Sequence, residues 1–202
     1  PNGYKRLIDH FNDPEAYPFF SYLHYRGVSL EQIKKHDIGY VTFGSIKTAS
    51  GKDIILRNHV VFLTKDYDGK EIYWNTRSIE SHPYIKTFNA PSNDQYYTRA
   101  EVIFNLYNAA QTGRVVINEG VFNALTVGES GIATFGKKVT NRQIELLQDC
   151  CKENPNLKLY VFLDSDAKKE AFDLAVSLRS FTSSVYLVGN STSKDANELG
   201  HE

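Results

Sequence analysis

The second half of the chain alternates short apolar runs with amphipathic segments, and this alternation limits the folds available to it. The apolar runs lie at residues 114–118, 132–135, 159–163 and 184–188. The helical patterns between them begin at Gly120, Thr140 and Ala167. Strands that alternate with helices form a parallel sheet through right-handed crossovers. We therefore predict a Rossmann-like α/β fold for this part of the chain.

The first half carries the start signals of two helices. Asp13 followed by Pro14 is the pattern of an N-cap and a first helical residue, and predicts a helix that runs to Gly27. Ser29 and Gln32 have the spacing of a capping box, in which each side chain bonds the other's backbone amide. This pattern predicts that a second helix begins directly after Ser29.

Strand signals follow these helices. Apolar segments flank Asp66-Tyr-Asp-Gly69, a strong β-hairpin signal, and residues 99–111 have the period of an amphipathic helix. We predict a boundary at Thr112-Gly113. A smaller mixed α+β subdomain then covers residues 1–112, and the α/β domain covers residues 113–202.

Composition excludes several classes of protein. The 23 basic and 24 acidic residues give a net charge of -1. The chain therefore has no overall positive charge to attract nucleic acid, and any contact with nucleic acid comes from a local groove. The two cysteines, Cys150 and Cys151, are adjacent, which excludes an ordinary disulfide framework and a CxxC zinc site. No apolar run has the length of a membrane span. We expect a cytoplasmic protein without a membrane partner.

Acidic residues follow three of the predicted strands. Glu119 comes directly after the first strand of the α/β part, Asp164 and Asp166 come after the third, and Asp195 follows the fourth. The carboxyl ends of parallel strands meet at one edge of the sheet, where ligands bind. Crowded carboxylates repel one another unless a cation compensates them, and oxygen ligands suit Mg²⁺ or Mn²⁺. Asp is also common as a helix cap at such turns, so spacing alone leaves a metal site and a set of caps both open.

Two short motifs carry a specific resemblance. Asn118-Glu-Gly-Val-Phe-Asn-Ala-Leu125 and Leu163-Asp-Ser-Asp-Ala167 resemble the two signatures of the Toprim domain, which bacterial-type primases, topoisomerases and some nucleases share. Their order along the chain and their position after strands match that domain.

The resemblance extends over nearly the whole chain and favours the primases. Upstream, the segments at residues 22–29, 38–40, 59–62 and 84–89, together with Arg77, are similar to the start and middle of the RNA-polymerase domain of bacterial- and phage-type primases. Residues 134–140 with Gln143 look like the segment between the two Toprim motifs.

The resemblance implies roles for the acidic residues. Glu119, Asp164 and Asp166 would hold two or more Mg²⁺ or Mn²⁺ ions, and Glu119 would act either as a ligand or as a general base. Asp195 looks like the first acid of a later Asp-x-Asp pair and would be a further ligand. Its second position is Asn197 here, and Asn123 stands where the family often has Asp.

The resemblance also implies roles for basic residues. Arg77, Lys86 and Arg99 look like the family's cations beside the catalytic edge, where they would contact template, primer or incoming triphosphate. We expect these three cations to face the acidic cluster across a polar groove between the two subdomains. From its loop position alone, Lys137 is a further candidate to contact substrate phosphates, and a solvated loop is the alternative.

The function expected from this resemblance is a DNA primase core that synthesises short RNA primers during DNA replication. Its partners would be a single-stranded DNA template, ribonucleoside triphosphates, the RNA primer and a replicative helicase. Two alternatives remain open. One is a Toprim-type nuclease or topoisomerase-like enzyme that acts on phosphodiesters with the same acids. The other is a non-catalytic adaptor that binds single-stranded DNA or a helicase.

Overall fold

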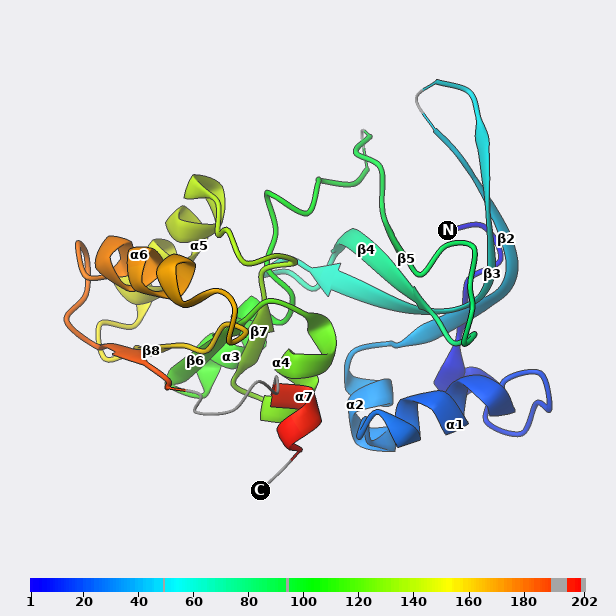
Figure 1. Ribbon diagram of the computed structural model, residues 1–202, viewed down its shortest axis with the longest axis horizontal. Coiled ribbons are helices and arrows are strands. Elements are labelled where there is room, and N and C mark those ends of the chain that lie inside the picture. The colour runs from blue at the N-terminus through cyan, green and yellow to red at the C-terminus, as the bar shows by residue number, and fades with distance from the viewer. Residues whose placement is uncertain (49, 94, 190–195, 201–202) are drawn as a thin grey trace. The chain divides into compact units, whose positions relative to one another are not determined.

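A computed structural model of the protein describes residues 1–48, 50–93, 95–189 and 196–200. The chain forms two compact units (Figure 1). The first unit comprises Pro1–Thr64 and Lys70–Thr98, and the second comprises Lys65–Gly69 and Arg99–Glu202. The sequence pattern puts a boundary after Thr112, whereas by its contacts the segment from Arg99 onward already lies in the second unit.

Within its described residues, the first unit combines a five-stranded sheet of order β1-β2-β3-β4-β5 with helices near its N-terminus. Its elements are β1 (Lys5–Arg6), the 3₁₀ helix η1 (Leu7–His10), α1 (Tyr17–Tyr25), α2 (Leu30–Lys35), β2 (Gly39–Lys47), β3 (Asp53–Lys65), β4 (Glu71–Ser78) and β5 (Thr87–Asn89). The sheet is antiparallel in its registered pairs, which join β1 to β2, β2 to β3 and β4 to β5.

The two helix-start predictions have different outcomes. The capping box of α2 is confirmed, because the Ser29 hydroxyl accepts a hydrogen bond from the Gln32 amide and the Gln32 side chain accepts one from the Ser29 amide. The predicted start at Asp13-Pro14 is wrong, since α1 begins at Tyr17. The Asp13 carboxylate instead accepts from the Glu15 amide, two residues on, and this local turn delays the helix.

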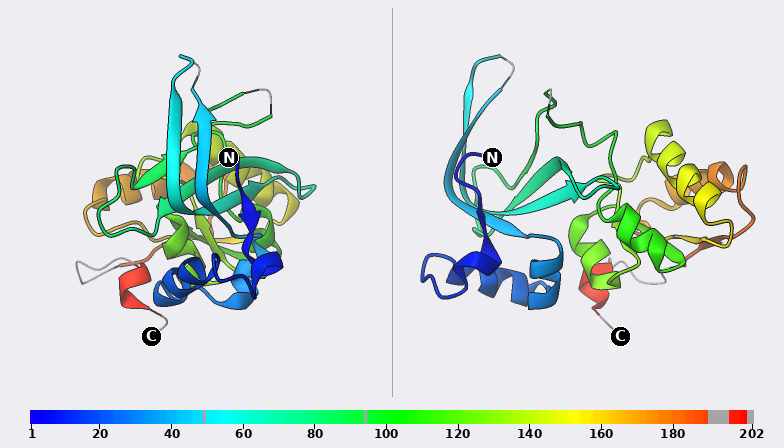
Figure 2. Two further views of the ribbon diagram at one scale, coloured as in Figure 1. Left: turned by 90° about the vertical axis from the view of Figure 1, so that its right-hand side faces the viewer. Right: turned by 180° about the vertical axis from the view of Figure 1, so that it is seen from behind.

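The predicted hairpin at Asp66–Gly69 joins β3 to β4, which are neighbours in the sheet. Gly69 adopts a φ of 79°, and its amide donates to the carbonyl of Asp66, which closes the turn. A second, longer hairpin joins β2 to β3 and extends beyond the rest of the sheet (Figure 2). The first unit is thus the mixed α+β structure that the sequence predicts.

Among its described residues, the second unit is built on a four-stranded parallel sheet of order β7-β6-β8-β9. Its elements are α3 (Leu106–Gln111), β6 (Arg114–Asn118), α4 (Val121–Val127), β7 (Gly131–Ala133), α5 (Asn141–Glu153), β8 (Lys158–Val161), α6 (Lys168–Leu178), β9 (Val185–Leu187) and α7 (Ala196–Leu199). The predicted fold class, a Rossmann-like α/β domain preceded by an α+β part, is confirmed.

Alternate residues of β6 and β8 face opposite sides of the parallel sheet. Val115, Ile117, Leu159 and Val161 are buried in one hydrophobic core with side chains of α3, α5 and α6. The start of β7 lies so close to α4 that a Cβ atom at Gly131 would collide with the Ala124 carbonyl. No helix in the described part of the chain combines the length and apolar character of a membrane span.

The predicted helix over residues 99–111 is only partly correct, because α3 begins at Leu106. Phe104 instead pairs with Ala133 beside β7 and is buried. Asn105 then adopts a left-handed conformation with a φ of 60°, which separates this extended segment from the helix. Packing of the apolar residues before Asn105 against the sheet overrides their helical period.

Gln143 holds this extended segment in place. It completes the capping box of α5 with Thr140 and is 1% exposed. Its side-chain amide also donates to the carbonyls of Arg99, Val102 and Thr134. One side chain therefore caps a helix and satisfies backbone acceptors from two other segments.

We expect Gln143→Ala to lower the free energy of unfolding by at least about 2 kcal/mol, because buried carbonyls lose their donors. Chemical denaturation checks this value. Gln32→Ala is the matched control, since Gln32 has the same capping-box position in α2 and should cost about 1 kcal/mol or less. Equal losses in the two variants would contradict a tertiary role for Gln143.

Candidate metal centre

The parallel pairing of β6 and β8 brings the predicted acids together. Ile117 pairs with Val161, so the two strands end side by side. Glu119 follows β6 at the turn into α4, and Asp164 follows β8 at the turn into α6. The backbone amide of Asp164 donates to the Glu119 carboxylate at 3.3 Å. This hydrogen bond joins the two turns at the carboxyl edge of the sheet.

Three carboxylates form one cluster at this edge. One oxygen from each of Glu119, Asp164 and Asp166 lies within 4.8 Å of the other two. Glu119 and Asp164 are half-buried, while Asp166 is exposed. Three hard oxygen donors at this spacing fit a divalent cation such as Mg²⁺ or Mn²⁺. The convergence expected from the sequence is therefore present, although ligand binding itself stays a proposal.

Burial and a neighbouring charge raise the pKa of one member of the cluster, Glu119. The pKa of Glu119 is raised to about 7, mainly because partial burial disfavours its charged form and also because Asp164 repels a second negative charge. The hydrogen bond from the Asp164 amide and the charge of Lys137 oppose this rise. A carboxyl group with this pKa binds either a proton or a cation near neutral pH.

Lys137 is the predicted basic residue that the structure places beside the acids. Its ammonium group lies 3.5 Å from the Asp166 carboxylate, and both side chains are largely exposed. Thr134 anchors the start of this loop, because its amide and hydroxyl both donate to the Asn118 carbonyl. The loop after β7 thus brings a positive charge to the cluster from the third neighbouring strand.

The other predicted site residues are distributed over both units. Arg77 on β4 pairs with Thr87 of β5, and Lys86 directly precedes Thr87. Arg77 and Lys86 are therefore neighbours in the first unit. Arg99 is exposed and lies in the second unit. Asp195 lies outside the residues that the structure describes. The roles of all four, and the expected groove, stay predictions.

Asn123 contacts the cluster, and Asn197 contacts Asn123, in ways that the sequence pattern did not reveal. The Asn123 amide donates to the Asp164 carboxylate at 3.2 Å, and its oxygen accepts from the backbone amide of Asn197 at 3.2 Å. The only signal in the sequence is that both positions resemble ones where the primase family often has Asp. The position of acids after strands identifies candidate ligands, but it does not show which neutral side chain contacts them.

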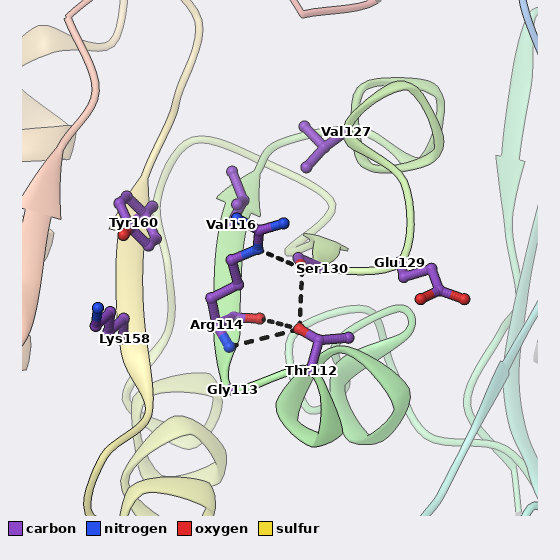
Figure 3. Close-up of a pocket in the computed structure, with 9 residues that line it drawn as sticks. All are labelled: Thr112, Gly113, Arg114, Val116, Val127, Glu129, Ser130, Lys158 and Tyr160. Atoms are coloured by element: carbon purple, nitrogen blue, oxygen red, sulfur yellow. Dashed lines mark hydrogen bonds between the residues drawn. The ribbon is translucent and has the colours of Figure 1, made fainter.

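A separate hollow of about 790 Å³ lies beside β6 and β8 (Figure 3). Arg114 and Lys158, the first residues of β6 and β8, line it together with Tyr160. The Arg114 guanidinium donates to the Ser130 hydroxyl at 3.2 Å. None of the predicted site residues that the structure describes lines this hollow. The carboxylate cluster follows the carboxyl ends of β6 and β8, whereas the hollow is lined by alternate residues within the same strands.

Comparison with solved structures identifies the fold. No family model and no curated protein matches the sequence. The structure is similar to the zinc-binding and RNA polymerase domains of the Aquifex aeolicus primase, with a TM-score of 0.75 and 24% identity over 96% of this chain. The chain spans only 55% of that structure.

Two further similar structures are catalytic domains. The E. coli primase catalytic core has a TM-score of 0.72 and 19% identity, over 95% of this chain and 71% of that one. The DnaG primase catalytic domain bound to single-stranded DNA has a TM-score of 0.70 and 19% identity, over 96% and 74% of the two chains. The protein therefore has the fold of a DnaG-type primase catalytic core.

Proposed function

We propose that the protein is the catalytic core of a DNA primase, which synthesises short RNA primers on single-stranded DNA by metal-dependent nucleotidyl transfer. The observation that carries this proposal is the convergence of Glu119, Asp164 and Asp166 at one sheet edge, in a fold similar to primase catalytic cores. Similar structures include one solved with single-stranded DNA, which supports such a template as the partner.

The three carboxylates act as the cation site in this proposal. Glu119, Asp164 and Asp166 would hold divalent cations, whose positive charge would favour attack by the primer 3′-hydroxyl and departure of pyrophosphate. Glu119 and Asp164 hold fixed positions because the hydrogen bond between their turns joins them. Asp166 is the most exposed of the three and faces solvent, where a triphosphate arrives. Asp195 is proposed as a further ligand.

The basic residues neutralise the nucleic acid and the nucleotide. Lys137 already contacts Asp166, and we propose that it transfers this contact to a substrate phosphate. Arg77, Lys86 and Arg99 are proposed to bind template, primer or triphosphate. Their charges offset the repulsion between substrate phosphates and the carboxylates. A replicative helicase and a cytoplasmic location complete the proposal, since a primase works where DNA is unwound.

Removal of one carboxylate tests the cation site. We expect Asp164→Ala and Asp166→Ala to lose Mg²⁺-dependent incorporation of labelled ribonucleotides on a single-stranded template. Both variants should fold, because removing one of three like charges relieves repulsion in the metal-free protein. Asp173→Ala, an exposed acid on α6, is the control and should keep wild-type activity.

The same assay separates the alternative functions. Extended primers support the primase proposal. Shortened template strands would instead identify a nuclease, and binding of the template without either product would identify an adaptor. Wild-type synthesis by Asp164→Ala or Asp166→Ala would show that the cluster is not the cation site.

The raised pKa of Glu119 predicts how the stability of the metal-free protein changes with pH. The folded pKa of about 7 lies above the ordinary value of 4.5, so between these values the folded state keeps a proton that the unfolded chain has lost. The stability that Glu119 contributes therefore falls as pH rises across this window.

We expect Glu119→Gln to remove this loss of stability with rising pH. In the presence of a chelator, its free energy of unfolding relative to wild type should rise between pH 5 and pH 8. Denaturant titrations at several pH values measure the difference. The relative stability of Glu153→Gln, an exposed acid on α5 outside the cluster, should change little. If the free energy of unfolding of Glu119→Gln relative to wild type stays constant or falls as pH rises, the assigned pKa is contradicted.

Substitution of the basic residues tests their proposed contacts. We expect Arg77→Ala, Lys86→Ala and Arg99→Ala each to weaken binding of template or nucleotide by about 1–3 kcal/mol, the cost of one charge-assisted hydrogen bond. Thermal unfolding should change little for Lys86→Ala and Arg99→Ala, because exposed charges add little to folding, whereas Arg77 is half-buried. Filter binding and steady-state kinetics measure these effects.

Two surface lysines serve as controls. Lys34 lies on α2, and Lys158 begins β8 at the opposite end from the carboxylates. Lys34→Ala and Lys158→Ala should bind template and nucleotide as wild type does. Equal weakening in the controls and the test variants would mean that positive charge acts only diffusely.

A further inference from the structure

Asn123 lies between the carboxylate cluster and the last described helix. It is on α4, which begins two residues after Glu119, and it is 7% exposed. Its side-chain nitrogen donates to one Asp164 carboxylate oxygen at 3.2 Å. Its side-chain oxygen accepts from the backbone amide of Asn197 on α7 at 3.2 Å. The side-chain amide of Asn123 therefore bonds to Asp164 and to α7 at the same time.

The side chain of Asn197 strengthens this link between α7 and α4. Its amide donates to the Thr126 hydroxyl at 2.9 Å, and that hydroxyl in turn donates to the Phe122 carbonyl at 3.0 Å. Asn123 and Thr126 are three residues apart, so they lie on the same face of α4. Two hydrogen bonds thus attach Asn197 to the helix face that also contacts Asp164.

An amide at this position serves both of its hydrogen-bond partners. Asp164 needs a hydrogen-bond donor, whereas the Asn197 backbone amide needs an acceptor, and an asparagine side chain supplies both. A carboxylate at position 123 would keep the acceptor, but it would place a fourth negative charge against Asp164. An alanine would provide neither group, so Asp164 would lose this donor and the Asn197 backbone amide would lose this acceptor.

We propose that Asn123 is a positioning residue, which orients the Asp164 carboxylate for a cation and makes that orientation depend on the docking of α7. This inference rests on the cation site of the proposed function. It adds that a neutral side chain limits the negative charge of the cluster and that helix α7 stabilises the geometry of the site.

Mn²⁺ binding, measured through the electron paramagnetic resonance of the free ion, tests the positioning role without requiring catalysis. We expect Asn123→Ala to bind Mn²⁺ about 10- to 100-fold more weakly, the usual effect of removing a partner that orients a ligand. Hydrogen exchange of the α7 amides should also become faster. Asn108→Ala, which loses a side-chain hydrogen bond on α3, is the matched control and should bind Mn²⁺ as wild type does.

A second variant separates positioning from a merely structural role. Asn123→Asp has nearly the same shape and keeps an acceptor for the Asn197 amide, so exchange of α7 should stay slow. Its added carboxylate repels Asp164 until a cation binds. The rise in Tm that saturating Mn²⁺ produces should therefore be larger than in wild type for Asn123→Asp, and smaller for Asn123→Ala. Equal changes in the two variants would overturn the proposal.

Asp164→Ala distinguishes failure of this inference from failure of the proposed function. If Asp164→Ala binds Mn²⁺ as wild type does, the cation site itself is wrong. If Asp164→Ala loses Mn²⁺ binding while Asn123→Ala keeps wild-type affinity, the site stands and the positioning role of Asn123 is rejected.

Discussion

The parallel pairing of β6 with β8 is the constraint on which the proposed site depends. This pairing aligns Ile117 with Val161 and ends both strands at the same edge of the sheet. The residues that follow must then share a small space, and the Asp164 amide bonds to Glu119 across it. If the strands ran antiparallel, the two turns would lie at opposite ends of the sheet and no cluster would form.

The folded chain keeps like charges together at this edge, and hydrophobic burial supplies the stability that makes this possible. Val115, Ile117, Leu159 and Val161 are almost fully buried beneath the turns that carry the acids. Burial of these side chains stabilises the sheet by about 1.5–3 kcal/mol each relative to exposure. The sheet then holds Glu119 near two other carboxylates, and partial burial together with the charge of Asp164 raises the pKa of Glu119.

Local signals in the sequence predict most of the elements. Thr140 with Gln143, like Ser29 with Gln32, begins a helix at the expected residue, because a capping box involves only residues three apart. Wrong predictions occur where a contact competes with the local signal. Asp13 forms a turn with Glu15 instead of capping a helix, and Phe104 pairs with Ala133 instead of joining α3.

The sequence by itself determined which acids follow strands and that the strands form a parallel sheet, because periodicity and capping are local properties of the chain. Only the tertiary structure decided that β8 lies beside β6, that Gln143 bonds to the carbonyls of residues before α3, and that Asn123 joins Asp164 to Asn197. Asn123 and Asn197 are 74 residues apart, and no local pattern records such a contact. Hydrogen bonds over that separation arise only when packing of the sheet and helices brings the two groups together.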